Sequence, residues 1–275
     1  MLAKYFEEAE PKDLSNWLWS KKYDGHRALW IPHLRGTRPD FMRSDVPATG
    51  LFTRYARVYR APDYFLDDLP TDRCLDGELV AGTLEETASV VKSHNADWTG
   101  THFHVFDSPT IQRVLERGQV RNPLYEHFFK GTDLYDPFLK FYELDFHGKY
   151  HSTVAQNPIT DVEEHFQSVI DAGGEGIMLR SKFASWRPTR SKLLLKRKQI
   201  HLGEGVITGY NPGKNALVGE IGSVQVNNLF KVSGFNARER ELIPYDHPIG
   251  ASIKYEHSDW TAAGVPRNAR FRRDS

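Results

Sequence analysis

The chain has 275 residues, 39% hydrophobic and 12% aromatic, which excludes a disordered or fibrous protein and leaves room for two domains. Its 36 basic and 36 acidic residues cancel, so net charge gives no argument for a nucleic-acid partner. The lone cysteine, Cys74, excludes an intramolecular disulfide, and no segment is apolar enough for a secretion signal or membrane span. We therefore expect a cytoplasmic protein with no membrane partner.

Short apolar or alternating runs, bounded by Gly, Pro, Asp or Ser, predict β-strands along the first two thirds of the chain. These runs are 26–31, 74–80, 103–106, 176–180 and 193–198.

Two helices are predicted between these strands. A Thr followed three residues later by Glu is the capping-box pattern, and it occurs at Thr83 and Thr160. The second pattern opens a stretch with one apolar helical face, which Gly173 and Gly174 end. The chain then enters the strand 176–180 directly, which places Glu175 beside a tight turn.

The sequence pattern changes near residue 200. Five short β-like runs separated by Gly, Asn and Pro follow, and they predict a small all-β barrel of OB type, with a small sandwich or SH3-like barrel as the alternative. We expect an α+β protein with domains 1–199 and 200–275. The five runs are 205–210, 222–226, 229–234, 251–257 and 269–273.

A basic window lies between Glu175 and Glu204, where no acidic residue occurs. Such a run is commonly a solvated face, and it also suits a phosphate-rich partner. Its basic residues are Arg180, Lys182, Arg187, Arg190, Lys192, Lys196, Arg197 and Lys198.

The most informative local pattern is the segment 22–27, which reads Lys-Tyr-Asp-Gly-His-Arg. It combines an amine nucleophile, a carboxylate, a Gly that permits a turn and an Arg at the start of a strand, a set suited to gripping a polyphosphate. A lysine amine attacks phosphorus in its neutral form, which neighbouring cations or desolvation favour. Read alone, the segment is equally a surface β-turn.

This segment resembles the adenylation motif of the covalent nucleotidyltransferase superfamily, which comprises DNA ligases, RNA ligases and mRNA capping enzymes. Segments resembling the remaining motifs follow in the family's order. The tail resembles the OB domain of small two-domain bacterial and phage ATP-dependent DNA ligases, so only the residues before Lys22 lack a counterpart. The motif-like segments are 53–54, 75–79, 103–107, 175–178, 190–191 and 194–198.

The resemblance implies a role for individual residues. It makes Lys22 the nucleophile, Glu78 the ribose contact, Phe106 the adenine platform and Glu175 the metal ligand. The implied catalytic residues are Lys22, Arg27, Lys196 and Lys198. The implied nucleotide-binding residues are Arg54, Glu78, Phe106, Glu175, Arg190, Lys196 and Lys198.

Two positions depart from the family pattern. Thr189 stands before Arg190 where relatives have Gly, and Tyr55-Ala56 follows Arg54 where relatives have a small residue and then Gly. The family pattern therefore does not define the loop geometry around Arg54 and Arg190.

Each motif residue also has a plainer structural interpretation. Glu78 suits a solvent-facing acid, Phe106 suits a core position, and the alternation at Lys196 and Lys198 suits the wet face of a strand. The joint occurrence of all the motifs in one order favours the family.

The resemblance implies an ATP-dependent DNA ligase that seals 5′-phosphate/3′-hydroxyl nicks through a covalent lysine–AMP and an adenylated DNA intermediate. Its cosubstrate is ATP, its metal Mg²⁺ with Mn²⁺ as substitute, and its partner nicked duplex DNA, which it binds as a monomer. The roles open to it are replication, repair and recombination. The alternatives are a GTP-using mRNA capping enzyme, an RNA ligase and a non-catalytic DNA-binding protein.

Overall fold

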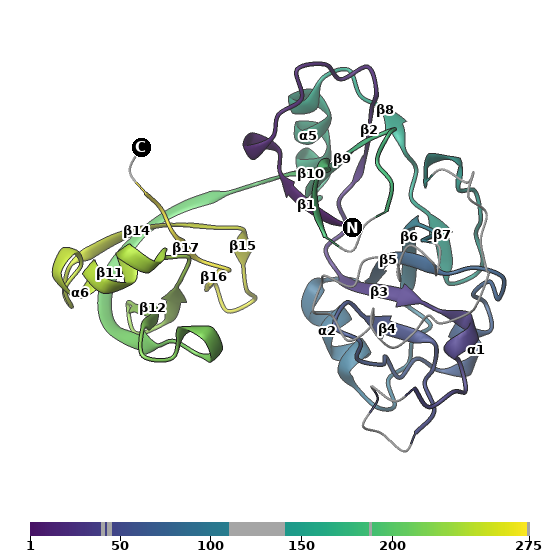
Figure 1. Ribbon diagram of the computed structural model, residues 1–275, viewed down its shortest axis with the longest axis horizontal. Helices are drawn as coiled ribbons and strands as arrows, with labels where there is room; N and C mark the ends of the chain where they lie inside the picture. Colours follow the sequence, from purple (N-terminus) through teal and green to yellow (C-terminus); the bar gives the residue numbers. More distant parts are fainter. Residues whose placement is uncertain (40–41, 43–45, 110–140, 187–188, 274–275) are drawn as a thin grey trace. The chain divides into compact units, whose positions relative to one another are not determined.

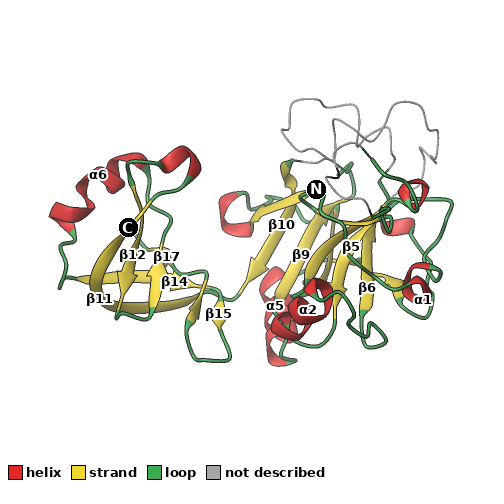
Figure 2. Ribbon diagram, turned by 90° about the horizontal axis from the view of Figure 1, so that it is seen from below, coloured by secondary structure: helices red, strands yellow, loops and turns green. Residues whose placement is uncertain are grey.

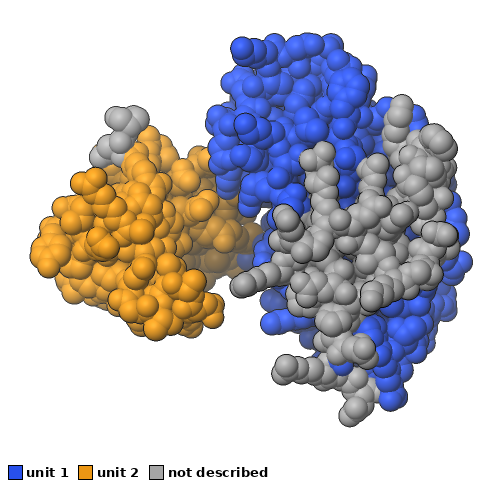
Figure 3. Space-filling model, in the orientation of Figure 1, with its two compact units in different colours: residues 1–197 blue, residues 198–275 orange. Residues whose placement is uncertain are grey.

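The computed structural model describes residues 1–39, 42, 46–109, 141–186 and 189–273. The chain divides into two compact units, residues 1–197 and 198–275, which Figure 3 shows in separate colours. Each unit has its own hydrophobic core. Arg187 of the basic window lies outside the described residues.

The first unit is built on two five-stranded sheets (Figure 1), with strand orders β1-β10-β9-β2-β8 and β4-β3-β5-β6-β7. Most neighbours are antiparallel, but β1 lies parallel to β10 and β7 parallel to β6. The first sheet consists of β1 (Leu2–Tyr5), β2 (Trp17–Lys21), β8 (Asn157–Pro158), β9 (Gly176–Ser181) and β10 (Arg190–Lys198). The second consists of β3 (His26–Trp30), β4 (Leu51–Thr53), β5 (Leu75–Val80), β6 (His102–Asp107) and β7 (His151–Thr153).

The described helices of this unit are short and lie beside the two sheets, so the predicted α+β class is confirmed. Helix α2 (Leu84–Lys92) packs on β3 and β5, and α5 (Val162–Asp171) packs on β9 (Figure 2). Among the described residues, no helix is both long and apolar enough to span a lipid bilayer. The remaining helical segments among the described residues of this unit are α1 (Asp63–Leu66) and the 3₁₀ turns η1 (Phe6–Glu8), η2 (Pro32–Leu34) and η3 (Phe141–Glu143).

One of the two predicted capping boxes is confirmed. The amide of Glu86 donates to Thr83 Oγ1 at 3.2 Å, and the Thr83 amide donates to the Glu86 carboxylate at 2.7 Å. The predicted box at Thr160 is wrong, because Asp161 caps α5 instead. Its carboxylate accepts the amides of Glu163 and Glu164 at 2.9 and 3.1 Å. A charged acceptor at this position also interacts favourably with the helix dipole.

The side chains of strand β6 alternate between the core and the opposite face of the sheet. Phe103 and Val105 are fully buried between β3, β5 and the adjacent helices. The alternating residues His104 and Phe106 lie on the opposite face and are half-buried. The core interpretation of Phe106 is therefore wrong.

The second unit has a five-stranded sheet in the order β13-β12-β11-β14-β17. A bridge between Ser233, next to β13, and Arg270 of β17 joins its two outer strands, so the sheet closes on itself. The five predicted strand runs are confirmed as β11 (His201–Pro212), β12 (Ile221–Val226), β13 (Phe230–Val232), β14 (Ser252–His257) and β17 (Arg270–Phe271).

Sequence reasoning missed the helix of this unit. Helix α6 (Ala237–Asp246) begins with a capping box formed by Asn236 and Glu239, a pattern visible in the sequence, but it contains Pro244. The other elements here are η4 (Asn215–Leu217), β15 (Asp259–Trp260) and β16 (Pro266–Arg267).

Candidate active site

A cavity of about 290 Å³ opens in the first unit and is lined by residues of both its sheets. This volume is near the lower end of small-molecule sites, which start at ~300 Å³. The predicted site residues that line it are Lys22, Arg27, Arg54, Glu78, Phe106, Arg190 and Lys196.

Lys22 lies where β2 ends. Its amide donates to the carbonyl of Gly176 at 2.9 Å, which ties the start of the turn to β9. Its amine contacts the carboxylate of Glu175, 153 residues away along the chain. Each of the two side chains is only 21% exposed, so the amine is held in the site and not in bulk solvent.

The turn after Lys22 needs its glycine. A Cβ at Gly25 would lie 2.1 Å from the carbonyl oxygen of Leu79, so only Gly allows the turn to approach β5 this closely. This approach brings Arg27 opposite Glu78 in the β3–β5 register.

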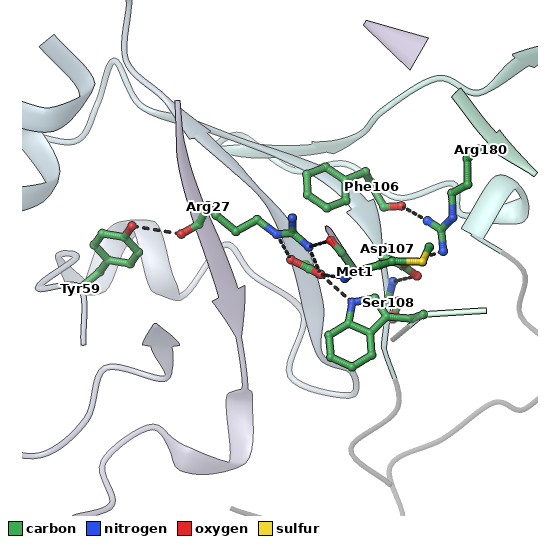
Figure 4. Close-up of polar contacts among 9 residues, drawn as sticks. Met1, Arg27, Tyr59, Phe106, Asp107, Ser108 and Arg180 are labelled. Carbon is green, nitrogen blue, oxygen red and sulfur yellow. Dashed lines mark hydrogen bonds and ion pairs between the residues drawn. The ribbon is translucent and has the colours of Figure 1, made fainter. Parts of the chain in front are cut away.

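Arg27 is held by a carboxylate below the cavity. Its Nε and Nη2 donate to the two oxygens of Asp76, both at 2.5 Å, and Trp186 Nε1 donates to the same carboxylate at 2.6 Å. Burial alone would lower the pKa of the Arg27 guanidinium and raise that of the Asp76 carboxyl, but their mutual attraction reverses both shifts. The Arg27 guanidinium also lies 4.6 Å from the ring centre of Phe106 (Figure 4).

Glu78 is half-buried and projects toward the same cavity. Burial raises the pKa of its carboxyl to about 7, although the positive charges of Arg27 and Lys22 oppose this shift. Glu78 therefore changes charge near neutral pH, unlike an exposed glutamate.

Two basic residues approach the cavity from β10. Arg190 donates to the carbonyl of Ala3 at 2.6 Å, and the Lys196 amine lies 4.0 Å from the ring centre of Tyr5. Both contacts are made to β1, whose first residues line the cavity. Sequence reasoning gave this N-terminal segment no role, because a parallel pairing across about 190 residues leaves no local signal.

Two predicted site residues, Glu175 and Lys198, are not among the lining residues, and a third, Arg54, lines the cavity but is exposed. Arg54 is exposed at the rim, with its guanidinium 4.5 Å from the ring centre of Tyr55. Glu175 touches Lys22 but is not among the lining residues, and neither is Lys198, which ends β10 and opens the second compact unit.

Other lining residues were missed. Met178 and Arg180 are alternate residues of β9, and alternate strand residues lie on one face. The sequence therefore did contain a signal that places them together. Val154 and Gln156 come from the loop after β7, where no periodic signal exists.

The described part of the chain contains no cluster of three or more His, Cys, Asp or Glu side chains that could hold a metal ion. Glu175 places one carboxylate beside the Lys22 amine. A single carboxylate can nevertheless bind Mg²⁺ together with substrate phosphates.

The arrangement is suited to a nucleoside triphosphate. Cationic side chains can bind phosphates, a half-buried aromatic ring can stack on a base, and a carboxyl can accept hydrogen bonds from a sugar. The Lys22 amine stands where these features meet.

No model of a known protein family matches the chain. It is 29% identical over 271 residues to a DNA ligase of Haemophilus influenzae, covering 95% of this chain and 87% of that protein. A solved structure from a structure–function study of Lig E DNA ligases matches with a TM-score of 0.69 and 26% identity, covering 99% and 97% of the two chains. A second, Pmar-Lig, has a TM-score of 0.67 at 17% identity over 66% of its length and supports the fold alone. The predicted resemblance to small DNA ligases is confirmed over nearly the whole chain.

Proposed function

We infer that this chain is an ATP-dependent DNA ligase, which joins a 3′-hydroxyl to a 5′-phosphate in DNA. The observation that carries the inference is the Lys22 amine against Glu175 at a cation-lined cavity, in a chain similar to DNA ligases along nearly its full length.

The reaction has three steps. The neutral Lys22 amine attacks the α-phosphorus of ATP, the bond to the bridging oxygen of the β-phosphate breaks, and pyrophosphate departs. The nitrogen loses a proton to solvent, which gives the lysine–AMP phosphoramide. An oxygen of the DNA 5′-phosphate then attacks the AMP phosphorus, the nitrogen–phosphorus bond breaks, and the nitrogen takes up a proton from solvent to regenerate the amine. Finally the 3′-hydroxyl oxygen attacks the 5′-phosphate, AMP departs, and the hydroxyl proton passes to solvent. Each step accumulates charge on phosphate oxygens, so positioned cations lower its barrier.

The predicted site residues divide this work. Glu78 accepts a hydrogen bond from the ribose and Phe106 stacks on adenine, which binds ATP without taking part in bond changes. The residues that face the phosphates are Arg27, Arg54, Arg190, Lys196 and Lys198.

Arg27 requires an additional step in this scheme. Its guanidinium is bonded through two nitrogens to Asp76, so a phosphate that recruits it competes with that carboxylate or uses its remaining N–H groups.

Glu175 fits a Mg²⁺ ligand, with Mn²⁺ as a substitute. It is a partly exposed carboxylate beside the attacking amine, and Mg²⁺ commonly binds through one or two carboxylates together with phosphate oxygens. When bound, the metal neutralises charge on the phosphates.

The two units take different parts of the task. We propose that residues 1–199 form the adenylation domain and residues 200–275 an OB-fold domain that grips nicked duplex DNA. Its contacts are to phosphates and largely independent of sequence. We further propose a monomer in the cytoplasm, where ATP is available. The basic residues assigned to this surface are Arg267, Arg270, Arg272 and Arg273.

The direct test is to incubate the purified protein with Mg²⁺ and either ATP or GTP, and then with a nicked DNA or nicked RNA duplex. Joining of nicked DNA with ATP is expected. Joining that needs GTP, or that occurs only with RNA, would assign the chain to another nucleotidyltransferase class. Failure to join nicked DNA with ATP would overturn the proposal.

A further inference from the structure

Four charged side chains lie in pairs next to Phe106. Arg27 lines the cavity and is half-buried, whereas Asp76, Asp107 and Arg180 are buried and have no part in the reaction steps given above. Asp76 and Asp107 are direct register partners on β5 and β6, and they are 2% and 6% exposed. One arginine neutralises each of them: Arg27 pairs with Asp76, and Arg180 pairs with Asp107 at 2.6 Å.

Arg180 joins the two sheets of the first unit. It projects from β9, in the first sheet, two residues beyond Met178. Its Nη2 donates to the carboxylate of Asp107 and its Nη1 to the carbonyl of Phe106 at 3.2 Å, both at the end of β6 in the second sheet (Figure 4). One planar guanidinium therefore ties both walls of the cavity together.

The rest of the environment leaves this guanidinium little freedom. Its carbon lies 3.6 Å from the ring centre of Phe141, and Asp107 also accepts the amide of Ser108 at 3.1 Å. Arg180 is only 5% exposed, and its Nε has no hydrogen-bond partner among the described residues. Burying an ion pair costs desolvation energy, so this pair is weak evidence for a role in stability alone.

We propose that the Arg180–Asp107 pair is a positioning pair, which holds the Phe106 ring and Met178 at the separation needed to clasp the nucleotide base and so sets the affinity for ATP. This rests on the ligase function proposed above. Neither side chain needs to touch the reacting phosphorus, so loss of the pair should weaken ATP binding while the chemistry at saturating ATP persists.

The test begins with Arg180→Lys, which keeps the charge but loses the planar fork that serves two acceptors at once. We expect the KM for ATP in formation of the lysine–AMP adduct to rise by about tenfold or more, because small misplacements of binding groups have effects of this size. The maximal rate at saturating ATP should change by less than about threefold. Sealing of a nick that already carries AMP, at saturating DNA, should remain near the wild-type rate.

A second variant covers the case in which Arg180→Lys fails to fold. Replacing both partners with apolar groups, Arg180→Met with Asp107→Leu, removes the pair without leaving a buried charge, and such exchanges are often tolerated. The double variant should show the same rise in KM.

Arg197→Ala is the matched control. It removes an arginine whose ion pairs, to Glu7 and Glu163, lie at the surface, and its KM for ATP should stay at the wild-type value. If the Arg180 variants lose thermal stability but keep the wild-type KM, the pair is merely structural and the proposal is wrong. If the wild-type protein forms no adduct at all, the ligase function itself fails.

Discussion

The two units of this protein differ in how far their charged side chains are buried. In the first unit, carboxylates and guanidinium groups are buried and paired, as at Asp76 and Asp107. In the second, the described residues include one buried polar side chain, His257, and arginines such as Arg270 and Arg272 are exposed. Bond formation at phosphorus needs cations in fixed geometry away from water, whereas a sequence-independent grip on DNA needs cations that reach into solvent.

The largest expected effect comes from removing the nucleophile of the first unit. Lys22→Ala should reduce ATP-dependent sealing of nicked DNA by more than about 10³-fold, because no other group can form the covalent intermediate. Sealing of a nick that already carries AMP should persist, since that step needs no lysine nucleophile. Lys22→Arg is the control for charge and should fail equally; ATP-dependent sealing by either variant would contradict the assignment.

The contrast in burial predicts a contrast in stability. Asp76→Ala leaves the half-buried Arg27 and the buried Trp186 Nε1 without their shared acceptor and should lower the free energy of unfolding by about 3–5 kcal/mol. The matched change in the second unit is Glu220→Ala, which removes an ion pair of 3.8 Å to Arg240 from a 44% exposed side chain and should cost less than about 1 kcal/mol. Urea unfolding of both variants measures the difference, and similar losses would show that the two units do not differ in this respect.

The exposed arginines of the second unit should act on DNA alone. The double variant Arg270→Ala/Arg272→Ala should weaken binding to nicked duplex DNA about tenfold and reduce the slope of log affinity against log salt by about two. Transfer of AMP from ATP to Lys22 should be unchanged. A binding titration at several salt concentrations tests this, and an unaltered salt slope would remove these arginines from the DNA surface.

The smallest expected effect is the change in folding stability with pH that Glu78 causes. Burial raises the pKa of Glu78 from 4.5 in the unfolded chain to about 7, so the folded state holds this proton more tightly. The contribution of Glu78 to stability should therefore fall as pH rises from about 5 to about 7 and then level off.

Glu78→Gln measures this effect, because glutamine stays neutral throughout. The melting temperature of the variant relative to wild type should increase by a few degrees between pH 5 and pH 8. A difference that stays constant over this range would show that Glu78 ionises as an exposed glutamate does.

The same contrast explains what the sequence could predict. Strand runs, the Thr83 cap and the glycine end of α5 are local patterns, and each is confirmed. The contact of Lys22 with Glu175 joins distant segments, and it was anticipated only because both belong to motifs of one family.

Other features have no local signal. The pairing of β1 with β10 and the link from Arg180 to Asp107 depend on which strands become neighbours, and strand neighbours far apart in sequence are set by the assembled core. The two-residue alternation of β9 does predict that Arg180 and Met178 lie on the same face of the strand. It does not predict that Arg180 pairs with Asp107 on the other sheet. Helix α6 was missed because Pro244 interrupts an otherwise helical segment.

The most direct test of the account is the intact mass of the purified protein after incubation with ATP and Mg²⁺, followed by peptide mapping. The account predicts a gain of one AMP per chain, located on the peptide that contains Lys22, and loss of that gain when nicked DNA is added. An unchanged mass, or AMP attached to another residue, would contradict it.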